Sequence, residues 1–175
     1  FEAKSGEVTA IIGSTGSGKS TIANIIPRFF EIQSGEISIN GQDIKKIPQK
    51  ELRDKIGFVP QKAFLFSGTI EENIRYGKED ASIEEVKHAA SIAQADEFIS
   101  DMEDKYDSFV AQGGNNLSGG QKQRISIARA LVRKPEVYVF DDSFSALDFK
   151  TDKRLRKALK NEIKDSSAII IAQRI

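Results

Sequence analysis

Residues 13–20 are Gly13-Ser14-Thr15-Gly16-Ser17-Gly18-Lys19-Ser20, a glycine-rich stretch that fits the pattern GxxxxGK(S/T). A β-branched, apolar run precedes this stretch from Glu7 to Ile12, and apolar residues at helical spacing follow it from Lys19 to Phe30. This pattern predicts a strand, a glycine loop and a helix in succession, which is the setting that the motif requires. The alternative, an ordinary glycine turn, does not explain that setting.

The glycine loop has the chemistry of a phosphate-binding site. Glycines let the backbone wrap around a phosphate and point successive N–H groups at it, and the start of the next helix adds its positive dipole end. Lys19 can reach the β- and γ-phosphates, and the Ser20 hydroxyl can ligate Mg²⁺. We therefore expect nucleotide to be bound by the loop and the first helical residues, namely Gly13, Ser14, Thr15, Gly16, Ser17, Gly18, Lys19, Ser20 and Thr21.

A second motif lies far along the chain. The fully apolar run Val137–Phe140 ends in Asp141 and Asp142, and such a run is typical of a buried parallel strand. Ligands of open α/β sheets bind at the carboxyl ends of the strands, so we expect Asp141 to hold Mg²⁺ through water. The glycine loop and this acidic strand end together predict a P-loop NTPase.

The other patterns divide the chain into a core and an insert. Short strands are predicted at residues 37–39, before an Asn-Gly turn, at 56–59 and at 168–172, and an amphipathic helix at 151–164. Between about 67 and 131 we expect helices only, one of them opened by a capping box of Ser82 and Glu85. The predicted fold is α/β: a core of residues 1–66 and 134–175 with a mainly parallel sheet and a small antiparallel part, and an all-helical subdomain at 67–133.

The composition excludes several other classes of protein. The 26 Lys and Arg balance 26 Asp and Glu among 175 residues, which argues against a polybasic nucleic-acid binder. The absence of Cys excludes disulfides and thiolate metal sites, and the one histidine, His88, is expected on the surface of the capped helix. The longest apolar run, residues 168–172, is far shorter than the roughly 20 residues of a membrane-spanning helix. Because the sequence starts just before one strand and stops as another finishes, we expect it to be a piece of a longer protein, truncated at both ends.

Residues 117–121 offer a second phosphate site. Leu117-Ser118-Gly119-Gly120-Gln121 places a serine and two glycines at the start of a helix, which can bind an anion on the same principle as the glycine loop. The alternative is that Ser118 only caps its helix after a flexible loop. One chain would therefore carry two helix starts suited to phosphate.

These motifs together resemble the nucleotide-binding domain of ABC transporters. Ser145-Ala-Leu-Asp148 fits that family as well, Gln61 after Gly57-Phe-Val-Pro60 matches its Q-loop, and residues 65–74 resemble its exporter branch, which includes multidrug and lipid exporters. The resemblance implies an ATPase that uses ATP and Mg²⁺ at the cytoplasmic face of the membrane and powers a transmembrane domain. In that family the LSGGQ helix of one domain caps the ATP held by another, head to tail.

The resemblance also implies roles for individual residues. Gln61 would contact Mg²⁺ and the attacking water and couple to the membrane domain, so the metal site would use Ser20, Gln61 and Asp141. The catalytic residues would be Lys19, Gln61, Asp142 and Gln173. Contacts to the partner's ATP would come from Ser118, Gly119, Gly120, Gln121 and Asp148.

Three positions depart from the family pattern. Asp142 stands where the family has its general base, a Glu, and its carboxylate falls back by roughly 1 Å, which can cost about 100-fold in rate. Gln173, in the segment that resembles the switch loop, replaces a His and cannot carry a proton. Gln112 stands where exporters commonly have Glu, which puts the usual contact to the membrane domain in doubt. LSGGQ, in contrast, is intact.

This asymmetry resembles one subunit of a heterodimeric exporter, whose own ATP site hydrolyses weakly while its LSGGQ completes the site of a different subunit. A fully active homodimeric exporter remains an alternative, and a regulatory ATP-binding module without transport is another. An ABC-type ATPase acting on DNA is disfavoured, because only 98 residues separate Gly18 from Leu117, with no long coiled coil. The expected partners are a second nucleotide-binding domain and an exporter's transmembrane domain. Nucleic acid is not expected to be a partner.

Overall fold

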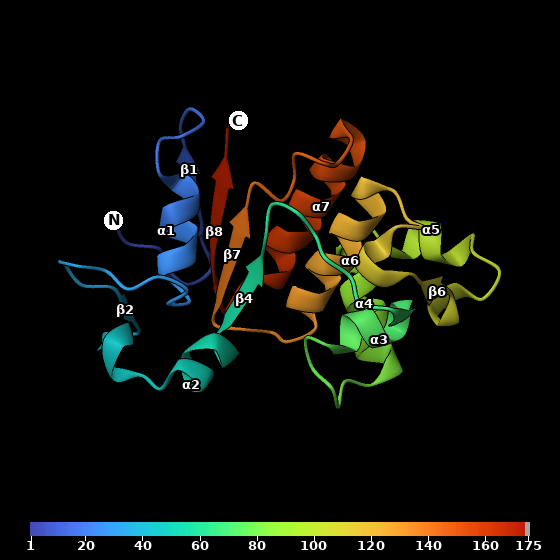
Figure 1. The fold of residues 1–175 in the computed structure, drawn as a ribbon, viewed down its shortest axis with the longest axis horizontal. Helices are drawn as coiled ribbons and strands as arrows, with labels where there is room; N and C mark the ends of the chain where they lie inside the picture. Colours follow the sequence, from blue (N-terminus) through green and yellow to red (C-terminus); the bar gives the residue numbers. More distant parts are fainter. Residues whose placement is uncertain (174–175) are drawn as a thin grey trace.

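A four-stranded parallel sheet lies at the centre of the structure, a computed structural model that describes residues 1–173 (Figure 1). Its strands are β1 (Val8–Ile12), β4 (Ile56–Val59), β7 (Val137–Asp141) and β8 (Ser167–Ala172). They lie in the order β1-β8-β7-β4, so the first and last strands of the chain are neighbours. Val8 pairs with Ala168, and Val137 pairs with both Ser167 and Ile56. The expected α/β fold with a parallel sheet is confirmed.

Both faces of this sheet are covered, which explains why its central strands are apolar throughout. Side chains alternate along a strand. Val139 therefore packs on one face with a cluster that includes Ala23 of α1 (Lys19–Ile25) and Leu52 of α2 (Gln49–Asp54). Tyr138 and Phe140 pack on the other face, with side chains of α6 (Gly119–Leu131) and α7 (Phe149–Glu162).

The helix after the glycine loop is shorter than expected. Its apolar spacing predicted a helix to Phe30, but α1 ends at Ile25. Arg28 adopts a left-handed conformation, with φ of 53°, and the amide of Phe29 donates to the carbonyl of Asn24 at 2.9 Å. This is a helix-terminating arrangement that apolar spacing does not reveal.

A small antiparallel part follows α1, as the Asn-Gly turn predicted. It consists of β2 (Ser38–Ile39) and β3 (Gln42–Asp43), and a 3-10 turn, η1 (Ile44–Lys46), leads on to α2. Asn40 and Gly41 both have positive φ, 51° and 77°, which a two-residue hairpin turn of this kind requires.

The segment between residues 67 and 131 is mostly helical, but the expectation of helices alone was wrong in one respect. Strands β5 (Gly68–Thr69) and β6 (Phe109–Val110) form an antiparallel pair. Two residues are too short for a strand to show a periodic pattern. The other elements are α3 (Ile70–Arg75), α4 (Ile83–Ile92), α5 (Asp96–Ser100), η2 (Lys105–Asp107), η3 (Gln112–Gly114) and α6.

Two helix starts of this segment were predicted correctly. Ser82 and Ser118 cap α4 and α6, each with a complete capping box. The stripe behind Ser82 is buried at Val86, Ala90 and Ala93. Helix α7 begins at Phe149, two residues earlier than expected, because the Asp148 carboxylate accepts a hydrogen bond from the amide of Thr151 at 3.0 Å.

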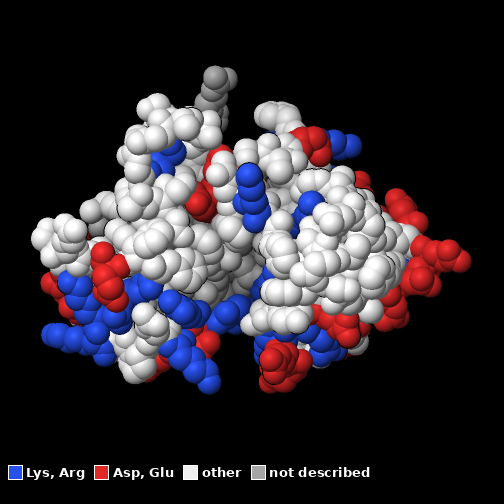
Figure 2. Space-filling model, in the orientation of Figure 1, with Lys and Arg blue, Asp and Glu red and all other residues white. Residues whose placement is uncertain are grey.

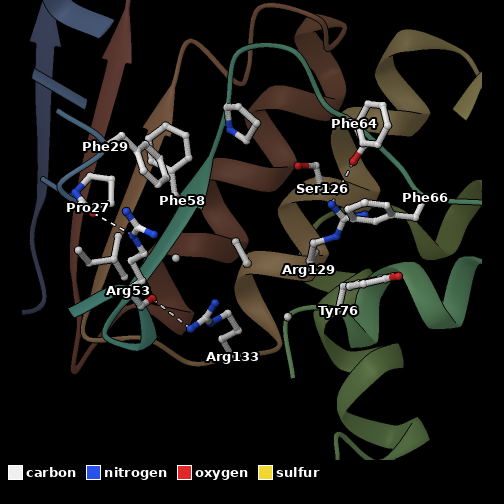
Figure 3. Close-up of a pocket in the computed structure, with 15 residues that line it drawn as sticks. Pro27, Phe29, Arg53, Phe58, Phe64, Phe66, Tyr76, Ser126, Arg129 and Arg133 are labelled. Carbon is white, nitrogen blue, oxygen red and sulfur yellow. Dashed lines mark hydrogen bonds between the residues drawn. The ribbon is translucent and has the colours of Figure 1, made fainter. Parts of the chain in front are cut away.

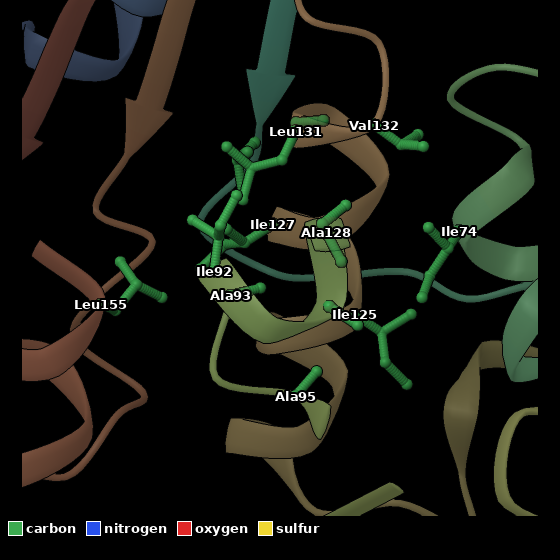
Figure 4. Close-up of a cluster of buried hydrophobic side chains, with 14 of the residues drawn as sticks. Ile74, Ile92, Ala93, Ala95, Ile125, Ile127, Ala128, Leu131, Val132 and Leu155 are labelled. Atoms are coloured by element: carbon green, nitrogen blue, oxygen red, sulfur yellow. The ribbon is translucent and has the colours of Figure 1, made fainter. Parts of the chain in front are cut away.

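The helical segment and the sheet share one hydrophobic core. A single cluster of buried side chains contains Ile74 and Ala93 of the helical segment, Ile127 of α6 and Leu155 of α7, all labelled in Figure 4, together with Phe140 of the sheet. The division of the chain at residues 66 and 133 therefore stays a prediction. Within residues 1–173, no helix has the length and apolar character needed to cross a membrane.

Candidate nucleotide-binding site

A pocket of about 290 Å³ lies at the carboxyl ends of β7 and β8. It brings together four segments that are far apart in the sequence: the glycine loop with the start of α1, the residue after Pro60, the acidic end of β7, and the end of β8. Its lining residues are Thr15, Gly16, Gly18, Lys19, Ser20, Thr21, Gln61, Asp141, Asp142, Ile171 and Gln173. Parallel strands place their carboxyl ends at one edge, which is why these segments meet there.

Backbone conformation explains two of the glycines in the loop. Gly16 and Gly18 have φ of 81° and 88°, and a Cβ atom added at either would meet nothing within 4 Å. These positions need glycine for their left-handed conformation and not for lack of space. Gly18 is also the N-cap of α1 and gives no side-chain hydrogen bond to the helix. The N–H groups of the first turn are thus left without a side-chain cap, as an anion-binding helix start requires.

The ammonium group of Lys19 lies within the glycine loop. Its Nζ donates to the carbonyl of Gly13 at 2.7 Å and to that of Ser14 at 2.6 Å, and it is 3.3 Å from Oγ of Ser17. A positive charge therefore lies among the backbone groups of the loop, where a phosphate would be attracted.

Ser20 and Asp141 form the oxygen pair expected for a magnesium site. Oγ of Ser20 donates to Oδ1 of Asp141 at 3.0 Å, and Asp141 is buried. Residues 1–173 contain no group of three or more His, Cys, Asp or Glu side chains that could hold a metal by themselves. A hydroxyl and one carboxylate fit Mg²⁺, which takes few protein ligands and completes its shell with water and phosphate oxygens.

Asp142 accepts hydrogen bonds from both glutamines of the pocket. Nε2 of Gln61 is 3.0 Å from Oδ2 of Asp142, and Nε2 of Gln173 is 3.2 Å from the same oxygen. Asp142 itself has a left-handed backbone, with φ of 46°. The sequence singled out all three residues but gave no indication that they meet at one atom.

The serine-glycine helix start lies outside this pocket. Ser118 and Gln121 form a closed pair: the amide of Gln121 donates to Oγ of Ser118 at 3.2 Å, and the amide of Ser118 donates to Oε1 of Gln121 at 2.9 Å. A Cβ atom at Gly119 would meet nothing within 4 Å, whereas one at Gly120 would lie 3.3 Å from the carbonyl of Ala146. In Figure 1, α1 and α6 lie on different sides of the strand β7.

Asp148 has a structural role within the chain itself. Its hydrogen bond with Thr151 at the start of α7 lowers the pKa of the Asp148 carboxyl, and the carboxylate is exposed. It does not line the pocket. The family resemblance implies only a contact with a partner's ATP for this residue, although Asp is a common helix cap.

Two other polar residues lie away from the pocket. Oε1 of Gln112 accepts a hydrogen bond from the amide of Ser67 at 3.3 Å. His88 is exposed on α4, with Nε2 3.3 Å from Oε2 of Glu162 on α7. The position of His88 agrees with the surface role expected from the sequence.

A larger groove, of about 370 Å³, was not foreseen. It runs between the sheet and the helical segment, with Pro27, Phe29, Phe58 and Arg53 on one side and Phe64, Phe66, Tyr76 and Arg129 on the other (Figure 3). Arg133 also lines it. The lining residues span positions 27 to 133, so no local pattern could have identified the groove. In Figure 2, Lys and Arg gather along the lower left half of the molecule, and this band reaches the hollow between the two halves.

Within residues 1–173, Arg133 of the groove pairs with Asp54 at 3.2 Å, whereas the other two arginines have no acidic partner. Arg129 donates to the carbonyls of Asn73 and Phe64, and its guanidinium lies 5.5 Å from the ring centroid of Phe66. Burial lowers the pKa of Arg129 to about 10. Within the described part of the chain, neither Arg129 nor Arg53 forms an ion pair, and no acidic side chain lines the groove.

Comparison with known proteins places this site in context. Residues 1–145 match the family model described as ABC transporter. The ABC transporter ATP-binding protein YfiB of Bacillus subtilis is 50% identical over 175 residues, which is 100% of this chain and 30% of that protein. ABC transporter B family member 14 of Arabidopsis thaliana is 45% identical over 175 residues, all of this chain and 14% of that protein.

A solved structure is similar in both sequence and fold. A bacterial Atm1-family ABC exporter with ATP bound matches with a TM-score of 0.95 and 42% identity, over 99% of this chain and 30% of that chain. The chain therefore spans less than a third of the length of each of these relatives.

Proposed function

The chain belongs to the ABC transporter family, and we propose that it is the ATP-binding domain of an exporter. It binds ATP with Mg²⁺, pairs head to tail with a second such domain, and drives export through an associated membrane domain. The observation that carries this proposal is the pocket in which the uncapped glycine loop, Lys19 and the Ser20–Asp141 pair converge.

The proposed roles follow from the chemistry of each group. The loop from Gly13 to Thr21 holds the phosphates through backbone N–H groups, and Lys19 supplies positive charge to them. Ser20, Asp141 and Gln61 hold Mg²⁺, which when bound neutralises charge that develops on the phosphates. Hydrolysis is an in-line attack of water on the γ-phosphate, with Asp142 as the base.

The helix start at Ser118 acts on a neighbouring molecule. Residues 118–121 do not line this chain's own pocket, although they have the form of an anion site. Together with Asp148 they complete the ATP site of a partner domain. The similar exporter was solved with ATP bound, which supports ATP as the ligand of such a domain.

This chain's own site hydrolyses ATP slowly, and its partner is a different subunit. Asp142 is one methylene shorter than Glu, and the Gln173 amide cannot carry a proton. Both altered residues act on the ATP of this chain, while residues 118–121 act on that of the partner. A homodimer with two fully active sites is the alternative. The rate of ATP hydrolysis by this chain alone distinguishes the two, because it is slow only if the site is degenerate.

The groove supports an association with a membrane domain at the cytoplasmic face of the membrane. The relatives are more than three times longer than this chain, so they have other segments to occupy the groove. Its aromatic walls suit an apolar anchor, and its arginines suit a carboxylate. We assign it to a short cytoplasmic segment of the membrane domain that carries an aromatic side chain and an acidic one.

Nucleotide titration of the isolated chain tests the proposal. Calorimetry is expected to show binding of ATP that depends on Mg²⁺ and weakens at least about 100-fold in Lys19→Ala. Lys87→Ala, an exposed lysine on α4, is the matched control and keeps the affinity. The proposal is contradicted if the unmodified chain has no magnesium-dependent affinity for ATP. It is also contradicted if that affinity survives in Lys19→Ala.

Charge reversal at Arg53 tests the assignment of the groove to a segment of the membrane domain. Arg53→Glu in the full exporter is expected to reduce ATPase coupling to transport at least about 5-fold, because the acidic partner is then repelled. Nucleotide affinity is unaffected, since Arg53 lies outside the nucleotide pocket. Lys50→Glu on the same helix, outside the groove lining, is the control. Equal effects of the two changes would refute this assignment.

A further inference from the structure

The side chain of Arg124 connects the start of α6 to two other parts of the helical segment. Arg124 lies on α6, six residues after Ser118. Its Nη1 donates to the carbonyl of Gln94, between α4 and α5, at 2.9 Å, and its guanidinium lies 4.7 Å from the ring centroid of Phe98 on α5. Its Nε lies 3.4 Å from the carbonyl of Gly120, in the first turn of α6 itself. The start of α6 is therefore connected both to α5 and to the turn that precedes it.

The turn that accepts the hydrogen bond from Arg124 has a defined geometry. Gln94 follows the end of α4 and has a left-handed backbone, with φ of 59°. The amide of Ala95 donates to the carbonyl of Ala90 at 2.7 Å, and the amide of Gln94 donates to the carbonyl of Ser91 at 3.0 Å. These two bonds form a Schellman motif, which ends a helix in one specific conformation. The acceptor of Arg124 therefore has a fixed position relative to α4.

The charge of Arg124 has acidic neighbours but no direct acidic partner. Arg124 is partly buried, and among residues 1–173 it forms no ion pair. Burial lowers its pKa, whereas the charges of Glu97 and Asp148 raise the pKa and that of Arg154 lowers it. Carbonyls and an aromatic ring thus take the place of water around the guanidinium, which stays protonated. Its contacts therefore fix its direction more than a flexible surface ion pair would.

The residue that Arg124 contacts on its own helix also touches the loop before α7. A Cβ atom at Gly120 would lie 3.3 Å from the carbonyl of Ala146, so the first turn of α6 packs closely on this loop. Two residues further on, the carboxylate of Asp148 accepts the amide of Thr151 and caps α7. The position of Gly120 thus decides how the start of α6 lies relative to Asp148.

We propose that Arg124 is a positioning residue for pairing: it fixes the helix start at Ser118 relative to Asp148, so that both reach the ATP of a partner domain together. This inference rests on the proposed function and names a residue that orients the surface presented to the partner. The capping box of Ser118 and Gln121 is closed within its own turn and does not orient α6 toward any other element. Arg124 supplies that orientation, because it contacts α5 and the turn before it.

Two substitutions of Arg124 test this role. Arg124→Met keeps an apolar stem against Phe98 but removes the charge and the donors, so ATP-dependent association, followed by sedimentation, is expected to weaken at least about 5-fold. Arg124→Lys keeps the charge and a donor, and its loss is expected to stay within about 2-fold. The proposal is overturned if association is unchanged in Arg124→Met, or if Arg124→Lys loses as much as Arg124→Met.

A second arginine provides a matched control. Arg156 of α7 also lies 4.7 Å from the ring centroid of a phenylalanine, Phe144, and it forms an ion pair with Asp152 on its own helix at 2.7 Å. Arg156→Met therefore removes a similar stacked charge that does not contact α6, and association is expected to stay within about 2-fold. Equal losses in Arg156→Met and Arg124→Met overturn the proposal.

Salt separates positioning from simple attraction of the partner's phosphates. At about 0.5 M NaCl, attraction between exposed charges is largely screened, whereas the direction of α6 is unaffected. The ratio between the unmodified chain and Arg124→Met is therefore expected to persist at this salt concentration. A ratio that falls to one would show that Arg124 acts through its charge alone, which overturns the positioning role.

Stability and nucleotide affinity, measured on the same variants, complete the test. Ser82→Ala weakens the helical segment without touching Arg124, so it is the reference for a loss of stability. If both variants lose association in proportion to their melting temperatures, stability alone is responsible and the proposal is overturned. Arg124 does not line the nucleotide pocket, so the MgATP affinity of Arg124→Met is expected to stay within about 2-fold.

The same measurements separate this proposal from the proposed function. An unmodified chain that binds no MgATP, or that does not associate when MgATP is bound, refutes the proposed function. A chain that binds MgATP and associates, but does so equally well as Arg124→Met, refutes only the role of Arg124.

Discussion

The two helix starts of this chain that suit an anion are built in opposite ways. Helix α1 begins at Gly18, which has a left-handed backbone and gives the helix no side-chain cap. Helix α6 begins at Ser118, whose hydroxyl accepts the amide of Gln121 while the Gln121 side chain accepts the amide of Ser118. The first start leaves its N–H groups to a ligand, whereas the second satisfies two of them from its own sequence.

This difference explains how one chain can hold two such sites for different molecules. An uncapped helix start has N–H groups that need an acceptor, so it binds phosphate with little rearrangement. A capped start is stable without a ligand, and it adds to binding only when a partner brings a phosphate against it. Under the proposed function, the glycine loop supplies the affinity of a single chain, and residues 118–121 supply contacts that form on pairing.

Giving α1 a cap like that of α6 is expected to have the largest effect. The hydroxyl of Gly18→Ser competes for the N–H groups once the backbone leaves its left-handed conformation for the extended one that Ser118 has, so MgATP affinity, measured by calorimetry, falls at least about 10-fold. Its backbone strain costs about 1 kcal/mol. Gly35→Ser is the matched control, because Gly35 also has positive φ, 86°, and open space around its Cβ position. If Gly35→Ser lowers affinity as much, strain and not capping is responsible.

A negative charge at the start of α6 has a smaller expected effect and a different readout. The Cβ position of Gly119 faces open space, so Gly119→Glu leaves the fold and this chain's own ATP affinity within about 2-fold. Repulsion of the partner's phosphate weakens ATP-dependent association about 5-fold, as followed by sedimentation. Gly119→Gln has a side chain of the same size without the charge, and it is expected to weaken the association less. An equal loss of association in both variants would identify the size of the side chain, and not its charge, as the cause.

Removing the two serine caps is expected to give the smallest change. Ser118→Ala and Ser82→Ala each break a capping box and lower stability by about 1 kcal/mol. The melting temperature then falls by about 2–4 °C in both variants. Only Ser118→Ala also weakens ATP-dependent association. A loss of association in Ser82→Ala would mean that the helical segment acts through its stability alone.

The sequence was most informative where structure is decided locally. The glycine loop, the acidic end of β7 and the capping serines at 82 and 118 depend on a few neighbouring residues, and each could be located from spacing and residue type. The parallel sheet followed from apolar runs separated by helices. These features also define the nucleotide pocket, so most of its residues could be named before the structure was known.

The features that the sequence did not predict depend on distant residues or on single dihedral angles. Helix α1 ends because Arg28 adopts a left-handed conformation, which no apolar pattern reports. Strands β5 and β6 pair across about forty residues with two residues each. The shared oxygen of Asp142 and the groove between the sheet and the helical segment both arise from tertiary packing. Chain topology, and not composition, produces them.

The common core of the sheet and the helical segment limits how the molecule can come apart. Tyr138 and Phe140 are buried in the same cluster as side chains of α4, α6 and α7. Excision of the helical segment would uncover part of one face of the sheet and expose aromatic surface to water. We therefore expect helix α6 and strand β7 to unfold together, in a single cooperative transition.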